Sequence, residues 1–402
     1  MVTERVKLEN PERFSKPHVI PKEKLEAAIK AACDKLEAYA KTHDMTKFPG
    51  TRSINFKYEL HDIDGPTEWW ESGMYTGTYL LAYQLTGKEI FREVVEAQLE
   101  TYRPRFERRI GVNGHDVGFI HVPSCVAAYK VLGREDMKDF ALEVLDFYYD
   151  NAYSKEGRFI IRSGKRGWNS PHGCRTMMDS MMNASFIFWG GEILGSEEYT
   201  KAAIDHTKTT ETYLIRPDGS SFHHFQFNPE DASPVKGVTL QGNSDDSCWS
   251  RGHSWGVYGF PIAYSYSKQP FQKEIHRDIT YFMLNHLPED LIPCWDYDFI
   301  KPTDPRDASA AAIAVCGMHE MCKYLTDADE QKAIFESAGA QMLESLIDNY
   351  TGDIGVEYDG LIHHVTHALP QGQGIDECAV YGDFFYLEAL MRYTNPDFKM
   401  YW

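Results

Sequence analysis

The sequence predicts an all-α protein built from repeated helical hairpins, and two observations support this prediction. First, an amphipathic segment ends in a short Leu-x-Gly turn and another amphipathic segment follows at once, several times along the chain. Glycine is common just after a helix because it adopts left-handed backbone angles without strain. Second, strand signals are few, with short candidates at residues 158–162 and 353–358.

The first predicted helix covers residues 22–43. Pro21 precedes it, and apolar side chains recur every three or four positions, as they do on one face of a helix. A second helix is expected from near Glu68 to the turn at Gly87, and a third begins at Lys88. Similar junctions follow at Leu132-Gly133, Leu194-Gly195, 264–269 and Leu325-Thr-Asp327.

About twelve helices in about six hairpins fit either an open solenoid or a closed α/α toroid. Closure requires the last hairpin to meet the first, and the apolar segment 375–393 could make that contact. If the short turns share one rim, the longer connections gather on the other rim and form one pocket. No linker or change of composition divides the chain, so we expect a single domain over residues 1–402.

The net charge of −19 argues against binding to nucleic acid or to an anionic membrane surface. No stretch is apolar enough to span a membrane, and no export signal is visible at the N-terminus. The eight cysteines are scattered without a CxxC pair, which fits free thiols in a reducing compartment. These features predict a cytoplasmic protein, with no particular oligomeric state.

The long connections are rich in tryptophan and in polar side chains. Flat aromatic faces beside Asp, Gln and His are how proteins hold sugar rings. The pattern therefore indicates a carbohydrate site, although aromatic residues in loops also line ordinary cores. The residues concerned are Trp69, Trp70, His115, Asp116, Trp168, His223, His224 and the segment 241–255.

Asp179 lies in the Met-rich segment 171–183, which is expected to be helical. On a helix, Arg175, Asp179 and Asn183 would share one polar stripe. One interpretation is a structural ion pair between Arg175 and Asp179. The other is that apolar surroundings raise the pKa of Asp179 until it can hold and deliver a proton.

Asp116 and Arg251 are further candidates, each with an alternative structural role. Asp116 is either a helix N-cap or the second carboxylate of a glycosidase pair. Arg251 and Trp255 are four residues apart on a helix expected to begin near 246 or 247. Arg251 could bind a substrate carboxylate or Asp245, and the flanking Trp249 and Trp255 favour the ligand.

Metal binding and nucleophilic hydrolysis have little support in the sequence. His363, His364 and His367 lie close together, but no acid follows at a spacing that completes a familiar metal site. The chain also lacks a phosphate-binding glycine loop and a GxSxG motif. We therefore expect no metal ion.

Several short motifs, in the same order, resemble those of the unsaturated glucuronyl hydrolases of glycoside hydrolase family 88, and the resemblance spans nearly the whole chain. The motifs are Trp-Trp-Glu-Ser-Gly at 69–73, Gly-His-Asp-Val-Gly-Phe at 114–119, Met-Asp-Ser-Met-Met-Asn at 178–183, Gln-Gly at 241–242, Trp-Ser-Arg-Gly-His-Ser-Trp at 249–255 and the closing segment 374–390.

This resemblance implies an (α/α)6 barrel and an unusual hydrolysis. Such enzymes act on oligosaccharides left by polysaccharide lyases, whose non-reducing end is a uronic acid with a C4=C5 double bond. An Asp protonates the vinyl ether at C4, water adds at C5, and the resulting hemiketal opens and releases the remaining sugar.

By motif match, Asp179 is the acid and base, which disfavours its ion pair with Arg175, and Asp116 holds ring hydroxyls and assists. The resemblance also implies hydrogen bonds from His115 and His223 and aromatic walls from Trp70, Trp249 and Trp255. Gln241 and Arg251 would lie near the polar groups of the substrate. No metal or organic cofactor is implied, and the expected partner is a small oligosaccharide bearing an unsaturated uronate.

One segment departs from the family pattern. Streptococcal members that favour sulfated disaccharides have a Ser-x-x-Ser-x-Lys pattern where this chain reads Ala-Leu-Pro-Gln-Gly-Gln at 368–373. The cationic residue is missing, which predicts a weaker preference for sulfate. Three alternatives compete with the main prediction: an unsaturated rhamnogalacturonyl hydrolase acting on pectin fragments, a sugar 2-epimerase that uses His residues, and a non-catalytic glycan-binding protein.

Overall fold

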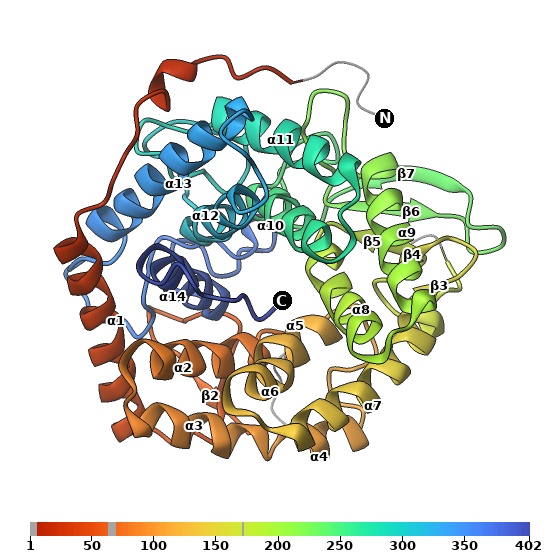
Figure 1. Ribbon diagram of the computed structural model, residues 1–402, viewed down its shortest axis with the longest axis horizontal. Helices are drawn as coiled ribbons and strands as arrows, with labels where there is room; N and C mark the ends of the chain where they lie inside the picture. Colours follow the sequence, from red (N-terminus) through yellow and green to blue (C-terminus); the bar gives the residue numbers. More distant parts are fainter. Residues whose placement is uncertain (1–5, 63–69, 171–172) are drawn as a thin grey trace.

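The computed structural model describes residues 6–62, 70–170 and 173–402, and most of them form helices arranged in a ring (Figure 1). The helices are α1 (Lys22–Thr42), α2 (Ser72–Thr86), α3 (Glu89–Leu99), α4 (Tyr102–Glu107), α5 (Val117–His121), α6 (Ala127–Leu132), α7 (Glu135–Ala152), α8 (Ser180–Leu194), α9 (Glu197–Tyr213), α10 (Ser250–Ser267), α11 (Pro270–Asn285), α12 (Ala308–Cys322), α13 (Glu330–Asn349) and α14 (Val380–Thr394). A π-helical turn at Val122–Val126 joins α5 to α6.

The helices form two layers. The inner layer runs from α2 through α5 to α8, α10, α12 and α14, each packed against the next, and α6 packs beside α2. These helices are apolar nearly all round, as expected for helices with neighbours on every side. α12 can approach α10 closely because Gly317 has no side chain; a Cβ there would lie 2.4 Å from the carbonyl oxygen of Val257. The outer helices are more polar on one face.

The ring is closed, because α14 packs against both α1 and α2. The expectation that the last hairpin meets the first is therefore confirmed, and the open solenoid is wrong. Four of the expected junctions have the expected left-handed residue after the helix, at Gly87, Gly133, Gly195 and Lys268. The expected start of the second helix near Glu68 lies outside the described residues, which resume at Trp70.

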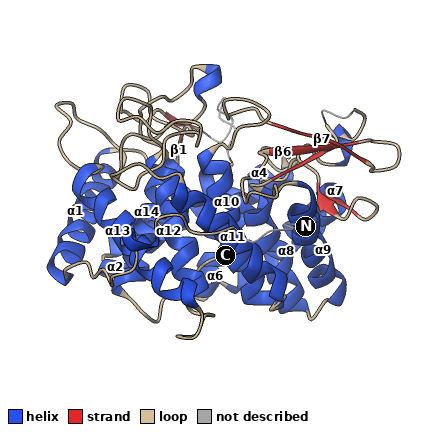
Figure 2. Cartoon of the chain, turned by 90° about the horizontal axis from the view of Figure 1, so that it is seen from above, coloured by secondary structure: helices blue, strands red, loops and turns tan. Residues whose placement is uncertain are grey.

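Strands β1 (Phe48–Pro49), β6 (His224–Phe227) and β7 (Pro234–Val238) and much of the irregular chain lie along one rim of the ring (Figure 2). β1 pairs with β2 (Leu60–His61), and β3 (Tyr153–Ser154) pairs with β4 (Phe159–Ile160). β5 (Arg175–Met177), β6 and β7 form an antiparallel sheet. The strand expected at 158–162 is thus partly confirmed, whereas the one expected at 353–358 is wrong, since those residues are irregular chain with a bend.

The segment before Asp179 is not the helix that its methionines predict. Arg175 pairs with Gln226 and Met177 pairs with His224, so the chain is extended there and α8 begins only at Ser180. Pairing with a strand about fifty residues later overrides the helix propensity of the Met-rich segment. Arg175, Asp179 and Asn183 therefore do not form one helical stripe.

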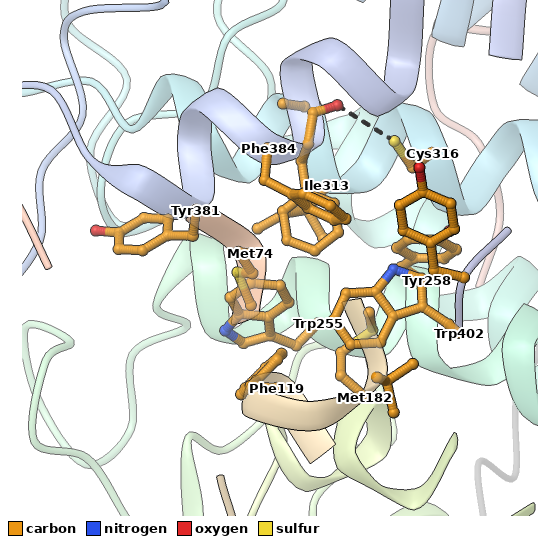
Figure 3. Close-up of a cluster of buried hydrophobic side chains, with 14 of the residues drawn as sticks. Met74, Phe119, Met182, Trp255, Tyr258, Ile313, Cys316, Tyr381, Phe384 and Trp402 are labelled. Atoms are coloured by element: carbon orange, nitrogen blue, oxygen red, sulfur yellow. Dashed lines mark hydrogen bonds between the residues drawn. The ribbon is translucent and has the colours of Figure 1, made fainter. Parts of the chain in front are cut away.

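The inner ends of the helices enclose the hydrophobic core. Trp255 of α10 contacts Phe119 of α5, with ring centroids 5.1 Å apart, and Phe119 contacts Trp402 at 5.9 Å. Figure 3 shows these rings gathered beside Met182. The indole nitrogen of Trp402 donates to Glu388 at 3.3 Å, which fixes the last residue inside the ring. This aromatic core packs beneath the loops of the rim.

Candidate active site

A cavity of about 200 Å³ opens on the loop-bearing rim. Its lining contains eight of the nine site residues implied by the family resemblance: Trp70, His115, Asp116, Asp179, Gln241, Trp249, Arg251 and Trp255. His223 lies just behind, with its ring 4.3 Å from that of Trp249. Trp69 lies outside the described residues. Chain folding thus brings together lining residues that are up to 303 positions apart in sequence, from Trp70 to Gln373.

Asp179 is the residue immediately before α8, at its N-cap position. Its Oδ1 atom is buried and has no hydrogen-bond partner among the described residues. Burial, followed by the negative charge of Asp116, raises the pKa of Asp179 from its usual value to about 7. No ion pair joins Arg175 to Asp179 in the part of the chain that the structure describes, so the structural interpretation of Asp179 is wrong. A carboxyl group that is protonated near neutral pH can act as a general acid.

Asp116 occupies the N-cap position of α5, but its side chain makes no capping hydrogen bond. The side chain is 32% exposed and lines the cavity. Burial raises its pKa to about 6, while the positive charge of Arg162 opposes this rise. Asp116 and Asp179 are thus two interacting carboxyl groups with different pKa values, the situation that lets one be protonated while the other is ionised.

His115 connects Asp116 to the start of α8. Its Nε2 lies 3.3 Å from Oδ1 of Asp116, and its Nδ1 lies 3.3 Å from Oγ of Ser180. Burial holds the pKa of His115 well below its usual value, so the ring is neutral near pH 7. An ionised carboxylate only accepts hydrogen bonds, so the ring proton belongs on Nε2 and Ser180 donates to Nδ1. Ser180 thereby orients the imidazole toward Asp116.

Three tryptophans of the described ranges line the cavity, and each packs against another ring of the protein. Trp70 stacks on Tyr381 with centroids 5.2 Å apart, while Trp255 packs on the core through Phe119. Trp249 packs against the ring of His223. Rings held on one face by protein leave the other face or edge for a ligand, and this suits the apolar face of a sugar.

Arg251 makes an ion pair and hydrogen bonds within the protein that the sequence did not predict. α10 begins at Ser250 rather than near 246, and Arg251 forms a buried ion pair with Asp307. Its Nη1 also donates to the carbonyl oxygen of Thr366 at 2.8 Å, and its Nη2 donates to that of His367 at 2.5 Å. The proposed pairing of Arg251 with Asp245 is therefore wrong.

Two glutamine side chains join the loops that form one wall of the cavity. Nε2 of Gln241 donates to the carbonyl oxygen of His367 at 3.0 Å, and Nε2 of Gln371 donates to that of Leu240 at 2.5 Å. This cross-linking fixes the 368–373 segment against the loop before α10. Seven further residues line the cavity: Arg162, Met177, Leu240, His367, Ala368, Gln371 and Gln373. Sequence reasoning noted segment 368–373 for its missing cation and His367 only as a possible metal ligand, and it assigned no site role to Arg162, Met177 or Leu240.

The histidines considered as metal ligands have other environments. His363 packs its ring against that of Tyr358, and Nδ1 of His364 contacts the carboxylate of Asp376. Within the described ranges, no group of three or more His, Cys, Asp or Glu side chains is arranged to hold a metal ion. The same residues contain no helix with the length and apolar character needed to cross a membrane.

A pocket with aromatic walls and two interacting carboxyl groups is typical of enzymes that cleave carbohydrates. Comparison with known proteins gives the family: residues 41–368 match Glycosyl Hydrolase Family 88. The chain belongs to this family and is a glycosidase. The epimerase and the non-catalytic binding protein are therefore not supported.

Individual relatives agree over nearly the full length. The chain is 36% identical over 397 residues to an unsaturated chondroitin disaccharide hydrolase of Streptococcus pneumoniae, covering 98% of both chains. It is 31% identical to an unsaturated glucuronyl hydrolase of Bacillus sp., covering 86% of this chain and 90% of the relative. The crystal structure of unsaturated glucuronyl hydrolase from Streptococcus agalactiae superimposes with a TM-score of 0.92 at 34% identity, covering 100% of both chains. A mutant of that protein has been solved in complex with dGlcA-GalNAc6S.

Proposed function

We propose that this glycosidase releases the Δ4,5-unsaturated uronic acid from the non-reducing end of lyase-generated disaccharides of the chondroitin and hyaluronan type. The observation that carries the proposal is Asp179, a buried carboxyl group with a free oxygen and a pKa raised to about 7. Relatives named as unsaturated chondroitin disaccharide hydrolases support the choice of substrate.

In this mechanism Asp179 gives its proton to C4 of the vinyl ether, and positive charge develops at C5 and the ring oxygen. A water molecule adds at C5 and returns a proton to Asp179, which restores the acid. The product is a hemiketal, which opens and releases the second sugar. Asp116, oriented by His115, accepts hydrogen bonds from ring hydroxyls, while Trp70 and Trp249 hold the sugar faces.

We also propose that the ring is an (α/α)6 barrel and that residues 1–402 act as a single catalytic domain. The closed inner layer and the packing of α14 on α1 and α2 support this architecture. One cooperative unfolding transition, the same by fluorescence and by circular dichroism, is expected; two separated transitions would contradict a single domain.

The test of the proposed reaction is the loss of ultraviolet absorbance when the C4=C5 enol ether is consumed. We expect loss of absorbance with unsaturated chondroitin and hyaluronan disaccharides, and slower loss with an unsaturated rhamnogalacturonan disaccharide. Faster reaction on the rhamnogalacturonan fragment would replace the proposed substrate by the pectin alternative. No reaction with any of the three would contradict the proposed reaction.

The two carboxyl groups give a prediction for pH dependence. The value of kcat/KM should fall above about pH 7, because Asp179 loses the proton that it must deliver. The value of kcat/KM should also fall below about pH 6, because Asp116 becomes protonated there and no longer accepts hydrogen bonds with both of its oxygens. Asp116→Asn should remove the acid limb and move the alkaline limb to lower pH, since the charge that raises the pKa of Asp179 is gone. An alkaline limb that stays in place would show that the two groups are not coupled.

A second prediction concerns sulfate. The 368–373 wall presents Gln371 and Gln373 to the cavity and contains no cation. Without a charged partner for sulfate, kcat/KM on a 6-sulfated unsaturated chondroitin disaccharide should lie within about fivefold of the unsulfated one. Gln373→Lys should increase the preference for the sulfated substrate. A strong sulfate preference in the unaltered chain would contradict this explanation.

We propose that the protein works in the cytoplasm. All eight cysteines are free thiols and seven of them are buried, which suits a reducing compartment. Cell fractionation tests this proposal, and recovery of the activity outside the cytoplasmic fraction would contradict it.

A further inference from the structure

Arg162 is a positively charged side chain on the cavity wall that no carboxylate neutralises. It lines the cavity beside Asp116 and Asp179. Among the described residues its side chain makes no hydrogen bond or ion pair within bonding distance, and its Nε is buried without a partner. Arg162 is half-buried, and a guanidinium group partly removed from water is usually paired, because leaving its charge uncompensated is costly. The unpaired state of Arg162 therefore calls for a partner that arrives with the ligand.

The main chain holds Arg162 firmly in this place. Its backbone N–H donates to the carbonyl oxygen of Arg175 at 2.8 Å, and its carbonyl oxygen accepts from the N–H of His115 at 3.0 Å. Arg162 is thus fixed between strand β5, which leads to Asp179, and the residue that contacts Asp116. A cation anchored this way acts at the reacting end of the pocket.

Arg175, directly across this backbone contact, makes the local charge more positive. It is 1% exposed, and its side chain also has no carboxylate partner in the described part of the chain. Burial and the nearby charge of Arg162 lower the pKa of Arg175 to about 10. Two adjacent uncompensated guanidinium groups in a protein with a net charge of −19 favour the binding of an anion at this wall.

Arg251, the other cation of the cavity, differs in this respect. Asp307 balances its charge, and both terminal nitrogens donate to Asp307 or to carbonyl oxygens. A bidentate pair with a carboxylate needs two parallel N–H groups on the guanidinium. Arg162 has its terminal nitrogens available for such a pair, whereas Arg251 has both of its own engaged.

We propose that Arg162 binds the carboxylate of the unsaturated uronate and thereby places C4 against Asp179. This inference rests on the proposed function and names the recognition element of the same site. The carboxylate is attached to C5, next to the carbon that receives the proton, so its binding site must lie beside the acid. Arg162 meets this requirement, because its charge acts on the pKa of both Asp116 and Asp179.

The test combines a substitution in Arg162 with a change in the substrate. The value of kcat/KM is measured for the unaltered chain, Arg162→Gln and Arg162→Lys on the unsaturated disaccharide and on its uronate methyl ester. Arg162→Gln should lower kcat/KM on the free acid about 10- to 100-fold, mainly through KM, and should change the ester little. Arg162→Lys, which keeps the charge, should recover part of the loss on the acid.

Equal losses on acid and ester would overturn the proposal, because they would show that Arg162 acts without contacting the carboxylate. A loss of kcat/KM confined to sulfated substrates would also overturn the proposal, and it would show that Arg162 binds sulfate instead of the carboxylate. Lys165→Gln is the matched control: it removes one positive charge from the same connection, is exposed, and should leave kcat/KM unchanged. Arg162→Gln should not lower the thermal midpoint below that of the unaltered chain, since no internal partner is lost and an uncompensated charge is removed.

This outcome is distinguishable from a failure of the proposed function. If the unaltered chain consumes none of the unsaturated disaccharides, the proposed reaction is wrong. If it consumes them and Arg162→Gln affects acid and ester alike, the reaction stands and only the role of Arg162 is wrong.

Discussion

Asp179→Asn is expected to abolish the loss of absorbance from unsaturated disaccharides, with kcat reduced by at least about 10²- to 10⁴-fold. The amide has nearly the shape of the protonated acid but has no proton to deliver to C4. Because Oδ1 of Asp179 has no internal hydrogen-bond partner, the substitution removes no structural contact of that atom. Rates of absorbance loss for purified protein and variant, at equal concentration, measure the effect.

The stability of the same variant provides the control. The pKa of Asp179 is raised from 3.8 to about 7 in the folded state, so the folded state favours the protonated form. Asp179 therefore weakens the fold progressively as pH rises from about 4 to about 7, and the cost is complete above this range. Asp179→Asn removes this cost and should raise the thermal midpoint at pH 8 but not at pH 4. If Asp179→Asn is inactive and has a lower thermal midpoint at pH 8, the loss of activity reflects misfolding. If Asp179→Asn remains active, another residue is the general acid.

The sequence predicts local features of the fold well and long-range ones less well. The turns at Gly87, Gly133 and Gly195 are readable because each depends on residues within a few positions, namely the end of one helix and the start of the next. Strand β5 cannot be predicted from its local sequence, since its partner β6 begins only at His224. The Met-rich segment carries a helix signal, and hydrogen bonds to a distant strand outweigh it.

In the candidate site, too, features set by local sequence were predicted and those that depend on distant contacts were not. Asp116, Asp179 and the tryptophans were identified by their composition and motifs, which a single segment displays. The partner of Arg251 is Asp307, 56 residues away, and no local pattern connects the two. Arg162 ends a short apolar strand candidate, and its importance depends on the absence of an internal partner, which only the folded structure shows.

The Arg251–Asp307 pair carries the second large expected effect. Asp307→Asn should lower the free energy of unfolding by about 3–5 kcal/mol, because it leaves the Arg251 guanidinium buried without a counter-charge. Both side chains are at most 1% exposed, so water cannot replace the lost carboxylate. Urea unfolding of the variant and the unaltered chain at the same pH measures the difference.

Asp34→Asn is the matched control, since Asp34 pairs with Lys30 on the surface of α1 with both side chains largely exposed. It should cost less than about 1 kcal/mol, as exposed ion pairs do. A further variant carrying both Arg251→Met and Asp307→Asn should recover part of the stability, because the uncompensated charge is then gone. If Asp307→Asn costs no more than Asp34→Asn, the buried pair is not what holds α10 to the start of α12.

Asp307→Asn should also weaken substrate binding, because Arg251 supports the aromatic walls of the cavity. The Arg251 guanidinium lies 4.6 Å from the ring of Trp249 and 4.7 Å from that of Tyr381, which supports Trp70. Releasing Arg251 from Asp307 therefore loosens two of the cavity walls while leaving Asp179 intact. KM should rise in Asp307→Asn while the pH profile of kcat/KM keeps its alkaline limb, because the group that titrates there is unchanged. A shift of that limb would mean that Asp307 acts on the acid itself, and not through the walls that hold the sugar.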